Sequence, residues 1–208
     1  MSTGWFNSGM TYDAEATRRR IFDAAVAEFT AHGLAGARID RIARQARANK
    51  QAIYLYFGGK EKLFGEVVRC KVDEICRGAD ISPFDFAEGV GLLFDWYGQN
   101  PEQIRLLLWE ALETRGEVQG EPERRASYRE RVREFRAAGV GAGLPEEEAV
   151  RAAQDRMFTI LGLVAWNFAV PQLCRLVLDE DDEAAALARR RESVVQTARV
   201  LAEAGRFS

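Results

Sequence analysis

Apolar residues recur every three or four positions along most of this 208-residue chain, and this spacing limits the folds open to it. It places the apolar side chains on one face of an α-helix, whereas a half-buried strand needs strict alternation. Alternating runs are scarce, only 5 prolines occur, and the helix-favouring residues Ala, Leu, Arg and Glu abound. Because 47% of the residues are hydrophobic, the chain can bury a packed core. The sequence therefore predicts an all-α protein.

Glycine, proline and asparagine divide this pattern into segments. After an N-terminal tail over 1–12, which lacks periodicity and is expected to be flexible, the first helix starts near Asp13 and ends at Gly33. Two short helices follow, with a break at Arg47 between them and Asn49 as the N-cap of the second. Longer helices are expected at about 60–77, 84–98, 102–115, 122–138, 146–170 and 181–204.

Positive charge is concentrated near the N-terminus. Residues 1–62 carry a net charge of +4 and the remainder −7, although the whole chain carries only −3. The imbalance is sharpest over 38–62, with a net charge of +5. A basic head on an acidic body is typical of a regulator that binds a polyanion, and a solvated charged face is the alternative reading.

Several classes of function are disfavoured by composition. The chain has a single histidine, His32 at the end of the first helix, and three cysteines without a C-x-x-C pair, which argues against most catalytic triads and zinc sites. It also lacks the glycine pattern of a phosphate-binding loop and a nucleophile elbow. We therefore expect no metal, no cofactor and no enzymatic activity.

Two further observations bear on location. No apolar run reaches the roughly 18 residues that a membrane span needs. The first residues lack the basic and then apolar regions of a signal peptide. We expect a cytoplasmic protein with no membrane partner.

Two short helices joined by a few residues, the second beginning with polar residues, are a candidate helix-turn-helix motif. In this motif the first helix crosses the DNA backbone, and the second lies in the major groove with its N-terminal side chains at base edges. Lys50 and Gln51 occupy those N-terminal positions. Glutamine pairs with adenine and lysine with guanine, so both residues are candidates for reading bases.

The segment IDRIARQARANKQAIYLYFGGKEKLF, residues 39–64, resembles the DNA-binding signature of the TetR family of bacterial transcriptional repressors. Its spacing Y-x-Y-F-x-x-K-x-x-L, which begins at Tyr54, is specific, and the match covers about 17–64. The resemblance implies a three-helix helix-turn-helix head over 13–60, followed by a larger α-helical ligand-binding and dimerisation domain over 61–208. The helix at about 60–77 links the two.

The resemblance also implies roles for individual residues. Gln51, Ala52 and Tyr54 fall where family members meet bases or the adjoining backbone. Lys50, Tyr56 and Lys62 fall where their side chains touch phosphate. Packing within the three-helix head is the alternative role for Tyr54.

Three positions depart from the family pattern. Arg38 replaces the usual threonine at the start of the second helix, so a hydroxyl cap is lost and a guanidinium near phosphate is gained. Arg47 replaces the usual turn glycine, so the turn adopts either a left-handed conformation that is costly for arginine or a different geometry. We take Arg47 as a candidate phosphate contact held in a strained turn. Leu55, at a position that is often polar, either touches a thymine methyl or packs on the head.

The body is expected to bind a ligand and a second copy of the chain. The segment 146–170 ends in a stretch that is apolar almost all round, typical of a dimer interface or a pocket wall, and 181–204 repeats this character. We expect a homodimer through these two helices. Most aromatic residues of the body either fill its core or, in part, line a cavity with polar anchors. The candidate ligand-binding residues are Trp96, Trp109, Glu110, Tyr128, Phe158, Trp166 and Asn167.

Together these features predict a ligand-responsive DNA-binding transcriptional regulator. The leading interpretation is a repressor that releases a palindromic double-stranded operator when an unidentified small molecule binds the C-terminal domain. The alternative is a helical binding module with a DNA-binding head that acts through protein partners or as an activator.

Overall fold

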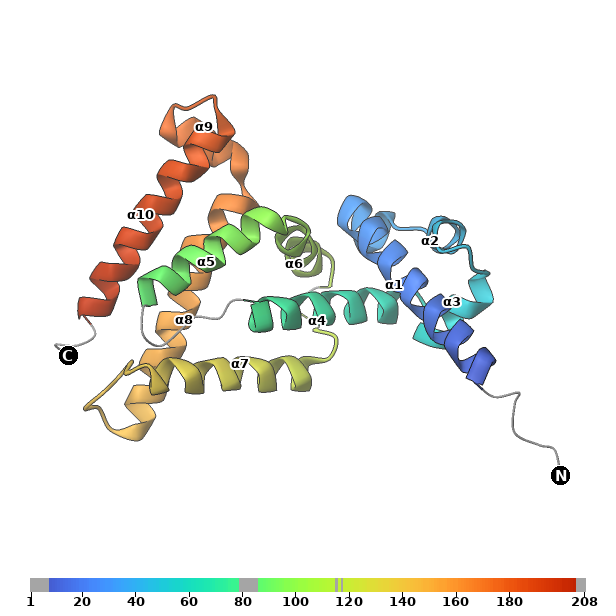
Figure 1. The fold of residues 1–208 in the computed structure, drawn as a ribbon, viewed down its shortest axis with the longest axis horizontal. Coiled ribbons are helices and arrows are strands. Elements are labelled where there is room, and N and C mark those ends of the chain that lie inside the picture. The colour runs from blue at the N-terminus through green and yellow to red at the C-terminus, as the bar shows by residue number, and fades with distance from the viewer. Residues whose placement is uncertain (1–7, 79–85, 115, 117, 205–208) are drawn as a thin grey trace. The chain divides into compact units, whose positions relative to one another are not determined.

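Helices account for all the regular secondary structure that the described residues contain, which confirms the predicted fold class (Figure 1). A computed structural model of the chain describes residues 8–78, 86–114, 116 and 118–204. The helices are α1 (Ser8–Gly36), α2 (Ile39–Gln45), α3 (Lys50–Phe57), α4 (Lys60–Gly78), α5 (Phe86–Gln99), α6 (Glu102–Glu113), α7 (Glu121–Ala137), α8 (Glu146–Ala169), α9 (Pro171–Leu178) and α10 (Glu183–Ala204). They divide between a first unit of residues 1–71 and 105–120 and a second unit of residues 72–104 and 121–208.

Helix α1 begins earlier than the sequence suggests. It starts at Ser8, so residues 8–12 of the predicted tail are helical, while residues 1–7 lie outside the described part of the chain. Gly33 has non-helical angles, φ 66° and ψ −174°, at the position where the sequence predicts the helix to end. Helical geometry resumes as far as Gly36, so the glycine produces a kink rather than a terminus.

The first unit holds α1, α2 and α3 together around a small apolar core. Helices α2 and α3 both pack against α1 and against each other (Figure 1). Ile21, Ile42 and Ile53, one from each helix, are completely buried. Phe29 of α1 meets Phe64 of α4 edge to face, with the ring centroids 5.1 Å apart. This core gives α3 a fixed base from which its opposite face projects.

The turn between α2 and α3 adopts the first of the two geometries that the sequence left open, because Arg47 is left-handed with a φ of 51°. The amide of Ala48 donates to the carbonyl of Ala43 at 2.9 Å, and the amide of Arg47 donates to the carbonyl of Arg44 at 3.2 Å. These two bonds form a Schellman motif, in which the left-handed residue is usually glycine. Arginine at this position is therefore strained.

The second unit is a bundle in which α10 packs on α5, α5 on α8, and α8 on α7 (Figure 1). One apolar cluster joins Val132 and Phe135 of α7 to Ala153 of α8. The carboxylate of Asp95 on α5 accepts two hydrogen bonds from the guanidinium of Arg191 on α10, at 2.7 and 2.8 Å. This bidentate pair fixes the register between the two helices.

Helix α9 is absent from the helices expected from the sequence. Pro171 reads as a stop signal after α8, but it occupies the first turn of a new helix, where its missing amide hydrogen is no loss. Among the described residues no single helix is long and apolar enough to cross a membrane. Helices α8 and α9 reach that length and hydropathy only as a pair bent by 88°.

Candidate nucleic-acid interface

Helix α3 is delimited by local signals that the sequence predicts. The side chain of Asn49 accepts a hydrogen bond from the amide of Ala52 at 2.7 Å, which confirms the expected N-cap. At the other end Gly58 adopts the left-handed conformation, with φ 76°, and its amide donates to the carbonyl of Tyr54. Both ends of this short helix are therefore fixed by its own sequence.

One face of α3 is anchored and the other is open. Ile53 and Phe57 are buried in the first unit. Gln51 is exposed, as are 58% of Tyr54 and 78% of Leu55. Neither Tyr54 nor Leu55 packs into the three-helix core, so the packing alternatives left open by the sequence do not describe this structure. The open face presents one amide, one phenol and one aliphatic side chain.

Four further predicted DNA-binding residues lie on α3 or in the first turn of α4, and they differ in exposure and in contacts. Ala52 and Tyr56 are half-buried. Lys50, at the first position of α3, forms an exposed ion pair with Asp40 of α2. Lys62, in the first turn of α4, is exposed, and its side chain lies over Gly58.

The basic residues of segment 38–62 fall into two groups. Three are engaged by other groups of the first unit: Arg41 by Glu28 and the carbonyl of Gly36, Lys50 by Asp40, and Lys60 by the carbonyl of Ala37. Within the described part of the chain, the side chains of the other four have no hydrogen-bond or ion-pair partner. These unengaged cations are Arg38, Arg44, Arg47 and Lys62.

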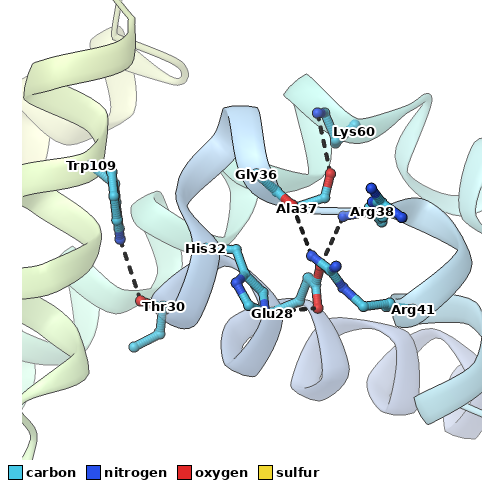
Figure 2. A network of polar contacts seen from close by, with 9 residues as sticks. All are labelled: Glu28, Thr30, His32, Gly36, Ala37, Arg38, Arg41, Lys60 and Trp109. Carbon is cyan, nitrogen blue, oxygen red and sulfur yellow. Dashed lines mark hydrogen bonds and ion pairs between the residues drawn. The ribbon is translucent and has the colours of Figure 1, made fainter.

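Glu28 is not among the site residues predicted from the sequence, yet its carboxylate organises the start of α2 (Figure 2). It is only 6% exposed. One of its oxygens accepts hydrogen bonds from the backbone amide of Arg38 at 2.8 Å and from Nε of Arg41 at 2.7 Å. Nε2 of His32 lies 4.0 Å from the other oxygen. Burial acts to raise the pKa of Glu28, but the hydrogen bonds from Arg41 and Arg38 and the nearby charges outweigh it, so the pKa lies below its ordinary value.

Helix α6 contacts residues 33–36, the last residues of α1 after its kink, which we call the elbow. Nε1 of Trp109 donates to the carbonyl of Thr30 at 3.3 Å (Figure 2). The carboxylate of Glu113 accepts from the amides of Leu34 and Ala35 at 2.5 and 3.0 Å. A Cβ atom at Gly33 would come within 2.8 Å of the side chains of Trp109 and Glu113, so only glycine fits beneath them. The residues from Arg105 to the end of α6 therefore belong to the first unit.

Two of the seven predicted ligand residues line one cavity of the second unit. A cavity of about 280 Å³ lies among α8, α9 and α10, and two predicted residues, Trp166 and Asn167, line it. Arg190 also lines it and donates from Nε to the side-chain oxygen of Asn167 at 2.9 Å. The remaining lining residues are Val170, Leu173, Cys174, Val177 and Leu178.

The other five predicted ligand residues lie elsewhere. Trp109 and Glu110 belong to the first unit, where the indole of Trp109 donates to the carbonyl of Thr30 on α1. Phe158 is 80% exposed on α8. Trp96 and Tyr128 are half-buried in the second unit and do not line the cavity.

Family models match both parts of the chain. The model for bacterial regulatory proteins of the tetR family matches residues 21–67, which include α2 and α3. The model for the tetracyclin repressor-like C-terminal domain matches residues 85–199, more than half of the chain.

Individual relatives agree with these models. The HTH-type transcriptional repressor SCO4008 of Streptomyces coelicolor is 39% identical over 188 residues, which span 90% of this chain and 95% of that protein. The HTH-type transcriptional repressor NicS of Pseudomonas putida is 35% identical over 106 residues, 48% of this chain and 50% of that protein. The crystal structure of transcriptional regulator SCO4942 of Streptomyces coelicolor superposes with a TM-score of 0.70 at 28% identity, covering 89% of this chain and 97% of that one. A regulator from Aquifex aeolicus, 16% identical with a TM-score of 0.56 and covering 89% of this chain and 99% of that one, shares the fold.

Proposed function

Because the chain belongs to the TetR family of bacterial transcriptional regulators, we propose that it is a repressor that binds a palindromic operator as a homodimer and releases it when a small molecule binds the C-terminal part. It is a DNA-binding transcriptional regulator, and its relative SCO4008 is named a repressor. The proposed activity belongs in the cytoplasm, with the chromosome, and requires no catalysis.

The observation that carries this proposal is the open face of α3. A recognition helix must pack one face firmly on the domain and leave the side chains of the opposite face exposed to enter the major groove. Helix α3 meets both conditions, since Ile53 and Phe57 anchor it while Gln51, Tyr54 and Leu55 are exposed. We assign base reading to Gln51, a thymine methyl contact to Leu55 and backbone or base contacts to Tyr54 and Ala52.

The four unengaged cations support phosphate binding. Arg38, Arg44, Arg47 and Lys62 are exposed and have no partner among the described residues. We assign them, with Tyr56, to the DNA backbone. Lys50 reaches DNA only by leaving Asp40 or by sharing its charge with it. An exposed pair of this kind is worth at most about 1 kcal/mol, so exchange with phosphate is feasible.

Exposed apolar residues on α8 and α10 support the proposed dimer. Phe158 is 80% exposed and Trp166 59% exposed on α8, and Val200 is exposed on α10. Large apolar side chains in such number on one pair of helices are typical of an interface that a second copy covers. The proposed dimer joins α8 and α10 of each copy in a four-helix arrangement, and two heads then read a two-fold symmetric site.

The cavity among α8, α9 and α10 supports the proposed effector site. Its lining is apolar except for Asn167 and Arg190, which suits a small apolar molecule with a single polar group. Release of the operator requires that the effector bind one arrangement of the heads more tightly than the other. By linkage, operator DNA then weakens effector binding by the same factor.

Helix α6 is the proposed route between the two parts of the chain. Its first residues, 102–104, belong to the second unit, and the rest belong to the first unit. In the first unit, Trp109 and Glu113 form hydrogen bonds with α1 on either side of its kink. A shift of α6 along its axis would therefore reach the elbow that leads into α2.

An electrophoretic shift on genomic fragments, with and without competitor DNA, tests the proposal. The chain should retain a subset of fragments against excess competitor. Lys62→Ala should weaken binding to all fragments alike and lower the magnitude of the salt slope of log K by about 1.8, because each copy in the dimer loses one phosphate contact. Gln51→Ala should instead relax sequence preference by roughly 1–3 kcal/mol at one base pair of each half-site. Binding that vanishes equally for all fragments in competitor would refute sequence-specific recognition.

A further inference from the structure

Helix α2 lacks a cap of its own. Its N-cap residue is Arg38, with extended backbone angles of φ −124° and ψ 122° and no side-chain capping bond. In a capping box, a hydroxyl or carboxamide at the N-cap and a carboxylate three residues later satisfy each other's amides. Here Arg38 and Arg41 hold those two positions, and neither guanidinium can accept a hydrogen bond.

Glu28 supplies the missing acceptor from a different helix. Its carboxylate takes the hydrogen bond from the amide of Arg38, as the third helical residue does in a capping box. It takes a second from Nε of Arg41, and Nη2 of Arg41 lies 2.6 Å from the same oxygen. Burying a charged carboxylate is costly unless it has such partners, so the Glu28 carboxylate, the Arg38 amide and the Arg41 guanidinium depend on one another.

The contacts among Glu28, Arg38 and Arg41 also determine which of the two arginine side chains remains available to DNA. The guanidinium of Arg41 also donates to the carbonyl of Gly36 at 2.8 Å, so it is bound on two sides and turned towards α1 (Figure 2). The side chain of Arg38 is exposed and has no such partner in the described structure. Of the two arginines at the start of α2, one is neutralised and the other is free.

We infer that Glu28 is a positioning residue for DNA recognition: its buried carboxylate fixes the start of α2 and withholds Arg41 from the DNA, so that Arg38 is the cation presented there. The inference rests on the proposed DNA binding. Loss of Glu28 releases Arg41 as an extra mobile charge, which strengthens contact with any phosphate backbone. It also loosens α2, against which α3 packs, and so weakens discrimination between sequences.

The test compares two DNA probes by fluorescence anisotropy across a range of salt concentrations. One is a duplex of about 30 base pairs that the wild-type chain selects from a random pool, long enough for two half-sites one helical turn apart. The other is its scrambled version. Glu28→Ala should steepen the salt slope on the scrambled duplex by up to about 1.8, one extra contact for each copy in the dimer, and reduce the ratio of affinities, selected over scrambled, roughly 3- to 30-fold.

Glu28→Gln separates the two effects and guards against a folding defect in the alanine variant. Its amide oxygen can still accept from Arg38, so the affinity ratio should recover towards wild type, while the lost charge leaves the slope steeper. Combining Glu28→Ala with Arg41→Ala should restore the wild-type slope. Asp23→Ala, at an exposed position of α1, is the control for the overall change in charge.

The outcomes are distinct. A slope in Glu28→Ala and Glu28→Gln no steeper than that of Asp23→Ala, or equal loss of affinity on both probes, would overturn the inference and reduce Glu28 to a fold-stabilising residue. A wild-type chain that selects no duplex, or binds both probes equally, would overturn the proposed function itself.

Discussion

Replacing Arg47 by glycine should raise the stability of the protein and lower its affinity for DNA. Arg47 has a φ of 51° at the glycine position of the Schellman motif that ends α2. The left-handed conformation costs a residue with a Cβ atom about 1–2 kcal/mol. Glycine removes that strain but adds about 0.4–1 kcal/mol of conformational entropy to the unfolded chain. The net gain is about 1 kcal/mol, which corresponds to a rise of about 3 °C in Tm for a chain of this length.

The effect on DNA has the opposite sign. Arg47 is exposed and unengaged within the described structure, and we assign it to a phosphate. Removing one such contact from each copy in the dimer lowers the magnitude of the salt slope by about 1.8. Strain retained beside a binding surface is expected where function supports it. Calorimetry would measure Tm, and fluorescence anisotropy across salt concentrations would measure the slope.

Asp179→Gly is the matched control for the Arg47 prediction. Asp179 caps α9 with a φ of 52°, and it belongs to the second unit, so its replacement should leave DNA binding unchanged. Its gain in stability should be smaller, because aspartate tolerates the left-handed region better than arginine. A lower Tm for Arg47→Gly would refute the strain argument. A higher Tm with unchanged affinity and slope would remove Arg47 from the DNA contacts.

Three further predictions follow from other sites. Gly33→Ala should lower stability by about 2 kcal/mol in urea denaturation, because it combines a φ of 66° with a Cβ atom 2.8 Å from Trp109; unchanged stability would mean that the elbow rearranges freely. Because the pKa of Glu28 is lower in the folded protein, the ionised carboxylate stabilises the fold. This contribution to the free energy of unfolding is complete above the ordinary pKa of 4.5 and is lost as the pH falls through the lowered pKa. The stability difference between wild type and Glu28→Gln should therefore shrink in acid, and a difference independent of pH would exclude the charged carboxylate as its cause. Phe158→Glu changes a side chain that is exposed in the single chain, so sedimentation should show a folded monomer, and a persistent dimer would place the interface elsewhere.

Local signals explain what the sequence could predict. Asn49 caps α3 through its own side chain, Gly58 ends the helix in the left-handed region, and Arg47 occupies a turn position whose geometry is set by adjacent residues. Each depends on the nearest few residues, so the type and spacing of residues suffice. The same holds for the two buried residues of α3, which follow from helical periodicity.

What the sequence could not predict depends on contacts between distant residues. Glu28 lies beside apolar residues on α1 and reads as an ordinary solvated charge; the one available clue was that Arg38 lacks a capping side chain. Trp109 and Glu113 act on α1, some 79 residues earlier in the chain. A cavity likewise depends on how helices pack, so aromatic content alone did not identify its lining. Helix α9 follows the predicted helix at about 146–170 directly, and the sequence does not reveal it, because proline both stops one helix and starts another.

Sequencing of the genomic fragments that the wild-type chain retains would test the central claim most directly. The proposed dimer with one recognition helix per head predicts an enriched motif of two inverted half-sites, with centres separated by a whole number of helical turns of about 10 base pairs. Gln51→Ala should lose information at one symmetric pair of positions while keeping the spacing. Retained fragments with no shared motif, or with a single half-site lacking symmetry, would contradict the claim that this protein reads its operator as a homodimer through α3.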